Sequence, residues 1–74
     1  MDRTELDRLL LEAHDHDDPA ALVRYYTIAA DECEAVQDID AACFYLTHAF
    51  IFALEAGASE TDELNHRLVA YGRA

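Results

Sequence analysis

Apolar residues recur with helical spacing through an uncharged stretch in the middle of the chain, residues 41–54. One face of this stretch carries small or aliphatic residues at intervals of four, three and four: Ala42, Leu46, Ala49 and Ala53. Such spacing is that of an amphipathic helix, and small side chains let a neighbouring helix approach closely. The stretch therefore predicts a central helix that other helices cover on more than one side.

The segment before it predicts a second amphipathic helix. Its apolar positions are separated by three or four residues: Leu22, Tyr26, Ala29, Cys33 and Val36. Asp18 is a favourable N-cap residue, and Pro19 suits the first helical position because its missing N–H is not needed there. A short turn near Gln37 and Asp38 joins this helix to the central one, so we expect an antiparallel helical hairpin.

Two shorter apolar stripes flank the hairpin. Their residues are Leu6, Leu9, Leu10 and Ala13 before it, and Leu64, Leu68 and Tyr71 after it. We expect Asp2 to cap the first of these helices, with Glu5 completing a capping box. We expect Ser59 to cap the last helix and Gly72 to end it, as Gly57 ends the central one.

The sequence thus predicts one all-α domain over residues 1–74. Its four short helices are expected at residues 3–14, 19–36, 39–56 and 60–71. A chain of this size buries only about 60% of its unfolded surface. The central helix has more apolar surface than so small a domain can cover, so we expect a homodimer.

The hairpin resembles a single tetratricopeptide repeat. The residues that carry the resemblance are Tyr26, Ala29, Ala30 and Cys33 in the first helix and Ala42, Leu46 and Ala49 in the second. The chain departs from the family at Ala30, where the family has glycine, and at Cys33, where it has tyrosine. Only one repeat fits, whereas three or more are usual in an independent solenoid. The resemblance implies a hairpin architecture and an activity of binding protein segments, while a plain four-helix bundle is the structural alternative.

Charge narrows the choice of partner. The chain has 16 acidic residues against five arginines, for a net charge of −11. Nucleic acid and anionic membrane surfaces would repel such a chain, so a basic or amphipathic protein segment is the expected partner. The uncharged stretch is shorter than the roughly 20 residues that span a bilayer. With no secretory pattern at the N-terminus, Cys33 and Cys43 are expected to be reduced thiols in a cytoplasmic protein.

Reaction chemistry has little support in the sequence. No nucleophile, base and orienting group occur together, and there is no phosphate-binding loop or dinucleotide fingerprint, so we expect no enzymatic activity, no cofactor and no metal site. The alternative is a small helical bundle that binds a metal or another ligand through His14, His16 and His48. For His48 we favour a hydrogen bond to a neighbouring backbone group.

Surplus aromatic side chains are the best indication of a binding surface, because exposed apolar patches mark interaction sites. We expect them to act together with the polar outward side of the preceding helix. The expected partner-binding residues are Arg24, Tyr25, Asp31, Glu34, Phe44, Tyr45, His48 and Phe52. The function expected from sequence is therefore that of a small interaction, adaptor or regulatory module, which also associates with itself.

Overall fold

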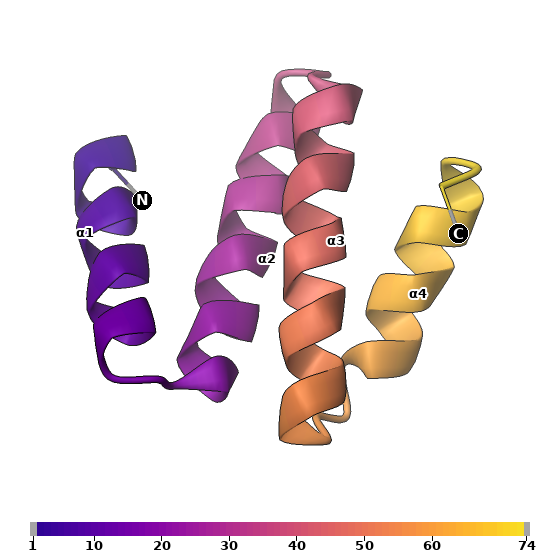
Figure 1. Ribbon diagram of the computed structural model, residues 1–74. Helices are drawn as coiled ribbons and strands as arrows, with labels where there is room; N and C mark the ends of the chain where they lie inside the picture. Colours follow the sequence, from indigo (N-terminus) through magenta and orange to yellow (C-terminus); the bar gives the residue numbers. More distant parts are fainter. Residues whose placement is uncertain (1, 74) are drawn as a thin grey trace.

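Four helices make up the part of the chain that the computed structural model describes, residues 2–73. They are α1 (Arg3–Asp15), α2 (Pro19–Ala35), α3 (Ile39–Ala56) and α4 (Thr61–Ala70), joined by short turns. The all-α prediction is confirmed, and every predicted helix end lies within one residue of the observed end. The helices run up and down in a row in the order of the sequence (Figure 1).

The row is only one helix thick. Its principal dimensions are 32 × 28 × 14 Å, and the smallest is close to the diameter of about 10–12 Å of one helix with its side chains. The α2–α3 interface is the largest, while α1 packs against α2 and α4 against α3. Because the helices do not close into a square bundle, both broad sides of the molecule reach solvent.

The predicted small-residue face of α3 forms the centre of the core. Ala42, Leu46, Ala49 and Ala53 have no exposed surface, and they pack with residues of α2 and α4. The other buried members of this cluster are Val23, Ala30, Cys43, Leu64 and Leu68. A smaller cluster joins α1 to α2 and contains Ala13, Ala21 and Leu22. The alanines allow close packing, while the leucines supply most of the buried apolar area.

Side-chain caps fix the starts of the two central helices. The Asp18 carboxylate accepts a hydrogen bond from the backbone N–H of Ala21 at 3.2 Å, as predicted, with Pro19 in the first turn. Asp38 plays the same role for α3, accepting from the N–H of Ala41 at 3.3 Å. α3 ends at Gly57, whose φ of 63° lies in the left-handed region that glycine tolerates.

The caps predicted for the outer helices are wrong. Asp2 occupies the N-cap position of α1, but its side chain makes no cap hydrogen bond, and its backbone carbonyl accepts from Leu6 instead. At α4 the N-cap residue is Glu60, whose side chain also makes no cap hydrogen bond. Ser59 donates to the Glu60 carboxylate at 3.3 Å, so its hydroxyl is directed away from the helix it was expected to cap. Both outer helices therefore start with less local support than the central ones.

The apolar stripe of α2 ends earlier than predicted. Val36 is 75% exposed, because the helix stops at Ala35 and Gln37 turns the chain with a φ of 61°. The backbone N–H of Asp38 then bonds back to the carbonyl of Cys33 at 2.9 Å. Cys33 is thus the last buried member of the stripe.

Helix α3 also has the length and composition of a membrane-spanning helix, with a mean hydropathy of 1.4. The core helix of a small helical domain meets the same criterion, and 28% of α3 is buried in the molecule. The expectation that the shorter uncharged stretch could not span a bilayer considered only part of this helix.

Candidate functional site

The outer side of α3 carries large side chains that the other helices leave partly uncovered. Phe44 is 57% exposed and Ile51 is 47% exposed, and they lie two helical turns apart on the same side of α3. We call their surroundings the aromatic face, which consists of Tyr26 from α2 and Phe44, Tyr45, His48, Ile51 and Phe52 from α3. No charged residue occurs in α3 between residues 41 and 54, so this surface is both apolar and uncharged.

Ring contacts hold the aromatic face together, with Tyr26 at their centre. Its ring stacks on Phe52 with centroids 5.9 Å apart, and it lies 5.2 Å from His48 and 6.2 Å from Tyr45. Phe44 lies 4.5 Å from the His48 ring and 5.3 Å from the Tyr45 ring. Such pairs contribute about 0.5–1.5 kcal/mol each beyond their buried area. The face is therefore a preformed surface and not a set of independent side chains.

Helix α1 fixes this face by reaching across α2 at two places. Near its end, the Nε2 atom of His14 lies 3.0 Å from the Tyr26 hydroxyl, and the His14 ring meets Phe52 edge-on at 5.7 Å. Near its start, the guanidinium of Arg3 donates to the Tyr45 hydroxyl and lies 5.3 Å above the Tyr45 ring. Burial raises the pKa of Tyr26. These contacts limit how far the tyrosine rings can move.

His48 makes the backbone hydrogen bond that the sequence suggested. Its Nδ1 atom lies 2.9 Å from the carbonyl oxygen of Phe44, one turn earlier in α3. The side chain is partly buried between the rings of Tyr26 and Phe44. His48 thus packs within the aromatic face, and its other ring nitrogen, Nε2, is not used in this bond.

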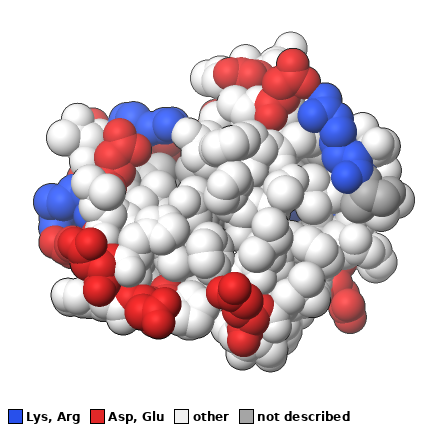
Figure 2. All heavy atoms as spheres, viewed as in Figure 1, with Lys and Arg blue, Asp and Glu red and all other residues white. Residues whose placement is uncertain are grey.

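Carboxylates border the uncharged surface. The broad side of the molecule seen in Figure 2 is free of charge over most of α2 and α3, and both acidic and basic residues lie along its margins. On α3 itself the uncharged stretch is bounded by Asp40 and Glu55. The surface therefore combines an uncharged centre with a charged margin. We call its carboxylates, Asp40 and Glu55, the acidic rim, and its arginines include Arg3 beside Tyr45 and Arg73 paired with Asp40.

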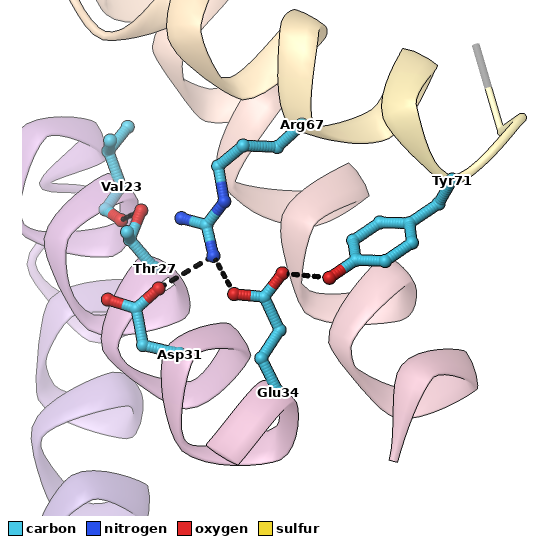
Figure 3. A network of polar contacts seen from close by, with 6 residues as sticks. All are labelled: Val23, Thr27, Asp31, Glu34, Arg67 and Tyr71. Atoms are coloured by element: carbon cyan, nitrogen blue, oxygen red, sulfur yellow. Dashed lines mark hydrogen bonds and ion pairs between the residues drawn. The ribbon is translucent and has the colours of Figure 1, made fainter. Parts of the chain in front are cut away.

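Asp31 and Glu34, which the sequence suggested as partner contacts, take part in a network with α4 (Figure 3). One nitrogen of the Arg67 guanidinium lies 2.7 Å from the Asp31 carboxylate and 2.6 Å from the Glu34 carboxylate. Tyr71 donates a hydrogen bond to the second oxygen of Glu34. That hydrogen bond and the charge of Arg67 lower the pKa of Glu34, while the bond to Glu34 raises the pKa of Tyr71. Both carboxylates are thus engaged by a single arginine within the chain.

The eight predicted site residues divide among three places. Phe44, Tyr45, His48 and Phe52 come together on the aromatic face, whereas Asp31 and Glu34 belong to the α4 network. Tyr25 packs against the α1–α2 cluster, and the Arg24 guanidinium lies 5.5 Å from its ring. Four residues that were not predicted from the sequence also take part in the aromatic face: Tyr26, Ile51, His14 and Arg3. Tyr26 lay in a predicted core stripe, and nothing in the sequence placed α1 against α3.

Residues 2–73 contain no group of three or more histidine, cysteine or acidic side chains arranged to hold a metal ion. The His14 ring bonds to the Tyr26 hydroxyl, whereas His16 is the C-cap residue of α1. Cys33 and Cys43 are buried free thiols. The geometry thus offers the His14, His16 and His48 alternative no support beyond the shared contact of His14 and His48 with Tyr26.

An open hollow of about 480 Å³ lies between the first half of α2 and the start of α4. It is lined by Ala20, Val23, Arg24, Thr27, Ile28 and Glu60. The Thr27 hydroxyl donates to the carbonyl of Val23 at 2.7 Å and so is occupied. No nucleophile with an adjacent base lines this hollow, so the aromatic face remains the stronger candidate site.

Comparison with protein-family models, with curated proteins and with solved structures finds no match for this chain. The function must therefore be argued from the aromatic face, its rigidity and its charged surroundings.

Proposed function

We propose that this protein is an interaction module that binds another protein through the aromatic face. The single observation that carries the proposal is the exposure of Phe44 and Ile51 at the centre of an uncharged aromatic surface. Protein interfaces are enriched in aromatic side chains and depleted of charge at their centres, and a few well-packed aromatic residues supply most of the binding energy. The surface is also broad and open, whereas small-molecule sites are concave.

Rigidity supports the same function. The rings of Tyr26, Tyr45 and Phe52 are held by one another and by α1. A partner therefore meets side chains that have already lost much of their rotamer freedom. Less conformational entropy is lost on association, which leaves more of the apolar contact energy for affinity.

Self-association through the same face is part of the proposal. Two copies related by a two-fold axis would bury Phe44 and Ile51 against one another. Each copy carries a net charge of −11, so repulsion opposes the dimer at low ionic strength. Salt screens that repulsion while apolar burial persists. We expect dimers to increase with both protein concentration and salt.

The test compares two double variants of the full chain. Phe44→Gln with Ile51→Gln removes the apolar centre of the face but retains good helix formers. Val36→Gln with Val69→Gln alters two other exposed apolar residues, which are 75% and 50% exposed, and serves as the matched control. Each protein is immobilised to capture partners from extracts of its own host, and captured proteins are then titrated in purified form.

A partner bound by the wild type and the control, but at least about tenfold more weakly by the face variant, would support the proposal. Sedimentation in low and high salt should show the same dependence for self-association. The proposal fails if every captured protein and every dimer is equally retained by the face variant while its helicity matches the wild type.

A further inference from the structure

We propose that the aromatic face binds a cationic amphipathic helix of a partner protein in preference to a second copy of this chain. This inference rests on the proposed function and specifies its partner. It follows from three features of the molecule: where its arginines are engaged, how its carboxylates are distributed, and how long the uncharged surface is.

Each arginine already has a partner within the chain. The pairs are Arg3 with Asp7 at 3.3 Å, Arg8 with Glu5 and Glu12 at 3.6 and 2.8 Å, Arg67 with Asp31 and Glu34, Arg73 with Asp40 at 2.7 Å, and Arg24 with the ring of Tyr25. The chain has no lysine. In a second copy, Arg24 is the one arginine among residues 2–73 outside an ion pair, and the other four could bind this chain only by giving up their own ion pairs.

A dimer would also bring two acidic rims together. With 16 acidic residues against five basic ones in each copy, the rim of one face would meet like charge from the other. Like-charge contacts across an interface cost several kcal/mol and select against the wrong partner. A partner that carries its own basic residues turns the same rim into an attractive border.

The uncharged surface has the length of a short helix. Asp40 and Glu55 bound it along α3, and a helical rise of 1.5 Å per residue places them about 22 Å apart. Glu55 is exposed and has no ion-pair partner among residues 2–73, and the carboxylate of Asp40 is 90% exposed although it pairs with Arg73. A partner helix of about four turns would span this distance, with apolar residues on Phe44 and Ile51 and basic residues near its ends.

Charged and apolar groups have separate roles in this arrangement, the first in the rate of association and the second in the stability of the complex. The acidic rim attracts the basic ends from a distance, and this attraction weakens as salt shortens the screening length. Contact with the rings supplies the energy that keeps the complex together. Rising salt should therefore lower the association rate of the partner helix much more than it raises the dissociation rate. For dimers of this chain the expected effect is the opposite, because salt screens their repulsion and favours association.

The experiment uses three labelled synthetic peptides of about 18 residues, enough for about 27 Å of helix. The first has a leucine face and lysines opposite it, the second has the same composition in scrambled order, and the third has glutamate in place of lysine. Fluorescence anisotropy measures their binding to the wild type, to the Phe44→Gln/Ile51→Gln and Val36→Gln/Val69→Gln variants, and to Glu55→Gln.

The expected result is binding of the lysine amphipathic peptide to the wild type and to the Val36/Val69 control. The Phe44/Ile51 variant should lose about tenfold or more in affinity, and Glu55→Gln should slow association by about twofold at low salt and by less at high salt. The scrambled peptide should bind only at low salt, and the glutamate peptide should not bind.

Several outcomes would overturn the inference. One is binding of the glutamate peptide as tight as that of the lysine peptide, and another is binding of the scrambled peptide that matches the amphipathic one and ignores Phe44 and Ile51. Dimers that form at low salt and exclude the peptides would assign the face to a second copy. Co-sedimentation with phosphatidylcholine vesicles that depends on Phe44 and Ile51, without peptide binding, would assign it to lipid. If a captured protein depends on the face but the peptides show no preference for lysine, the interaction function stands and only the partner chemistry is wrong.

Discussion

The two outer helices both reach across a neighbour, but they do so with different chemistry. α1 crosses α2 to reach α3 through an imidazole, a guanidinium and aromatic rings. α4 crosses α3 to reach α2 through an arginine, a tyrosine and two carboxylates. Ring stacking depends little on salt, whereas ion pairs are weakened by salt and by acid. We call the contacts from α1 to α3 the α1 bridge and those from α4 to α2 the α4 bridge. The α1 bridge should therefore depend little on salt, whereas the α4 bridge should weaken in salt and in acid.

The aromatic face and the acidic side of α2 also differ in how far their side chains are engaged within the chain. Arg67 and Tyr71 use the carboxylates of Asp31 and Glu34 to secure α4. At the aromatic face the rings contact one another but leave Phe44 and Ile51 half exposed. One helix, α2, thus contributes two carboxylates to the α4 network and Tyr26 to the aromatic face.

The largest expected effect on stability comes from a charged substitution on the buried side of α3, compared with the same substitution on its exposed side. Leu46→Asp should abolish folding, because Leu46 has no exposed surface and burying an unpaired carboxylate there costs several kcal/mol. That cost is comparable to the whole stability of a small domain. Circular dichroism and thermal melting measure the loss. Ile51→Asp is the matched control and should stay folded, since Ile51 is 47% exposed. Native melting of Leu46→Asp would show that the buried face is misassigned.

Sequence periodicity was enough to predict the helices and the face of α3 that is buried, because both depend on residues three or four apart. The Ala42 to Ala53 spacing and the Asp18–Pro19 start are local signals, and both predictions are confirmed. Val36 was misassigned, since where a helix stops depends on the turn that follows it as well as on the apolar period.

The bridges could not be predicted in the same way. Arg67 meets Asp31 and Glu34 across separations of 36 and 33 residues, and His14 meets Phe52 across a similar gap. No sequence pattern states which helices lie side by side or how they lean. From the sequence, Asp31 and Glu34 were therefore predicted as partner contacts and His14 was grouped with His16, because a sequence shows only which residues are close along the chain.

A second prediction concerns the contacts of Glu34 with Arg67 and Tyr71 in the α4 bridge. Glu34→Gln should lower the free energy of unfolding by about 1–2 kcal/mol, because Arg67 and Tyr71 lose a charged hydrogen-bond partner that is only partly exposed. Urea denaturation gives this value, and hydrogen exchange should show α4 opening first. Glu12→Gln, which removes the exposed partner of Arg8 within α1, should cost less than about 0.5 kcal/mol. Equal effects of the two substitutions would contradict a special role for the bridge.

The third prediction concerns acid. The pKa of Glu34 is lowered in the folded state, so its contribution to stability is present above the ordinary glutamate pKa and is lost as pH falls through the lowered value. The loss should approach that caused by Glu34→Gln, because a protonated carboxyl and an amide are both uncharged and both still accept a hydrogen bond. Unfolding of the wild type and Glu34→Gln is compared from pH 7 to about pH 3. The difference in the free energy of unfolding between the two proteins should become smaller as the pH falls. A constant difference would show that protonation of Glu34 does not weaken its contacts with Arg67 and Tyr71.

The smallest expected effect lies at the α1 bridge. His14→Ala removes one hydrogen bond and two ring contacts from an exposed side chain, so the stability of the domain should fall by only about 0.5–1 kcal/mol. Its main consequence should be local, because Tyr26 and Phe52 lose the group that holds them from the α1 side. We expect faster ring motion by NMR and weaker binding of the lysine amphipathic peptide. His16→Ala, in the adjoining turn, should change neither. If His14→Ala changes neither ring motion nor peptide binding, the aromatic face is held by α2 and α3 alone. The contacts from α1 would then only stabilise the packing of that helix, as the contacts from α4 do.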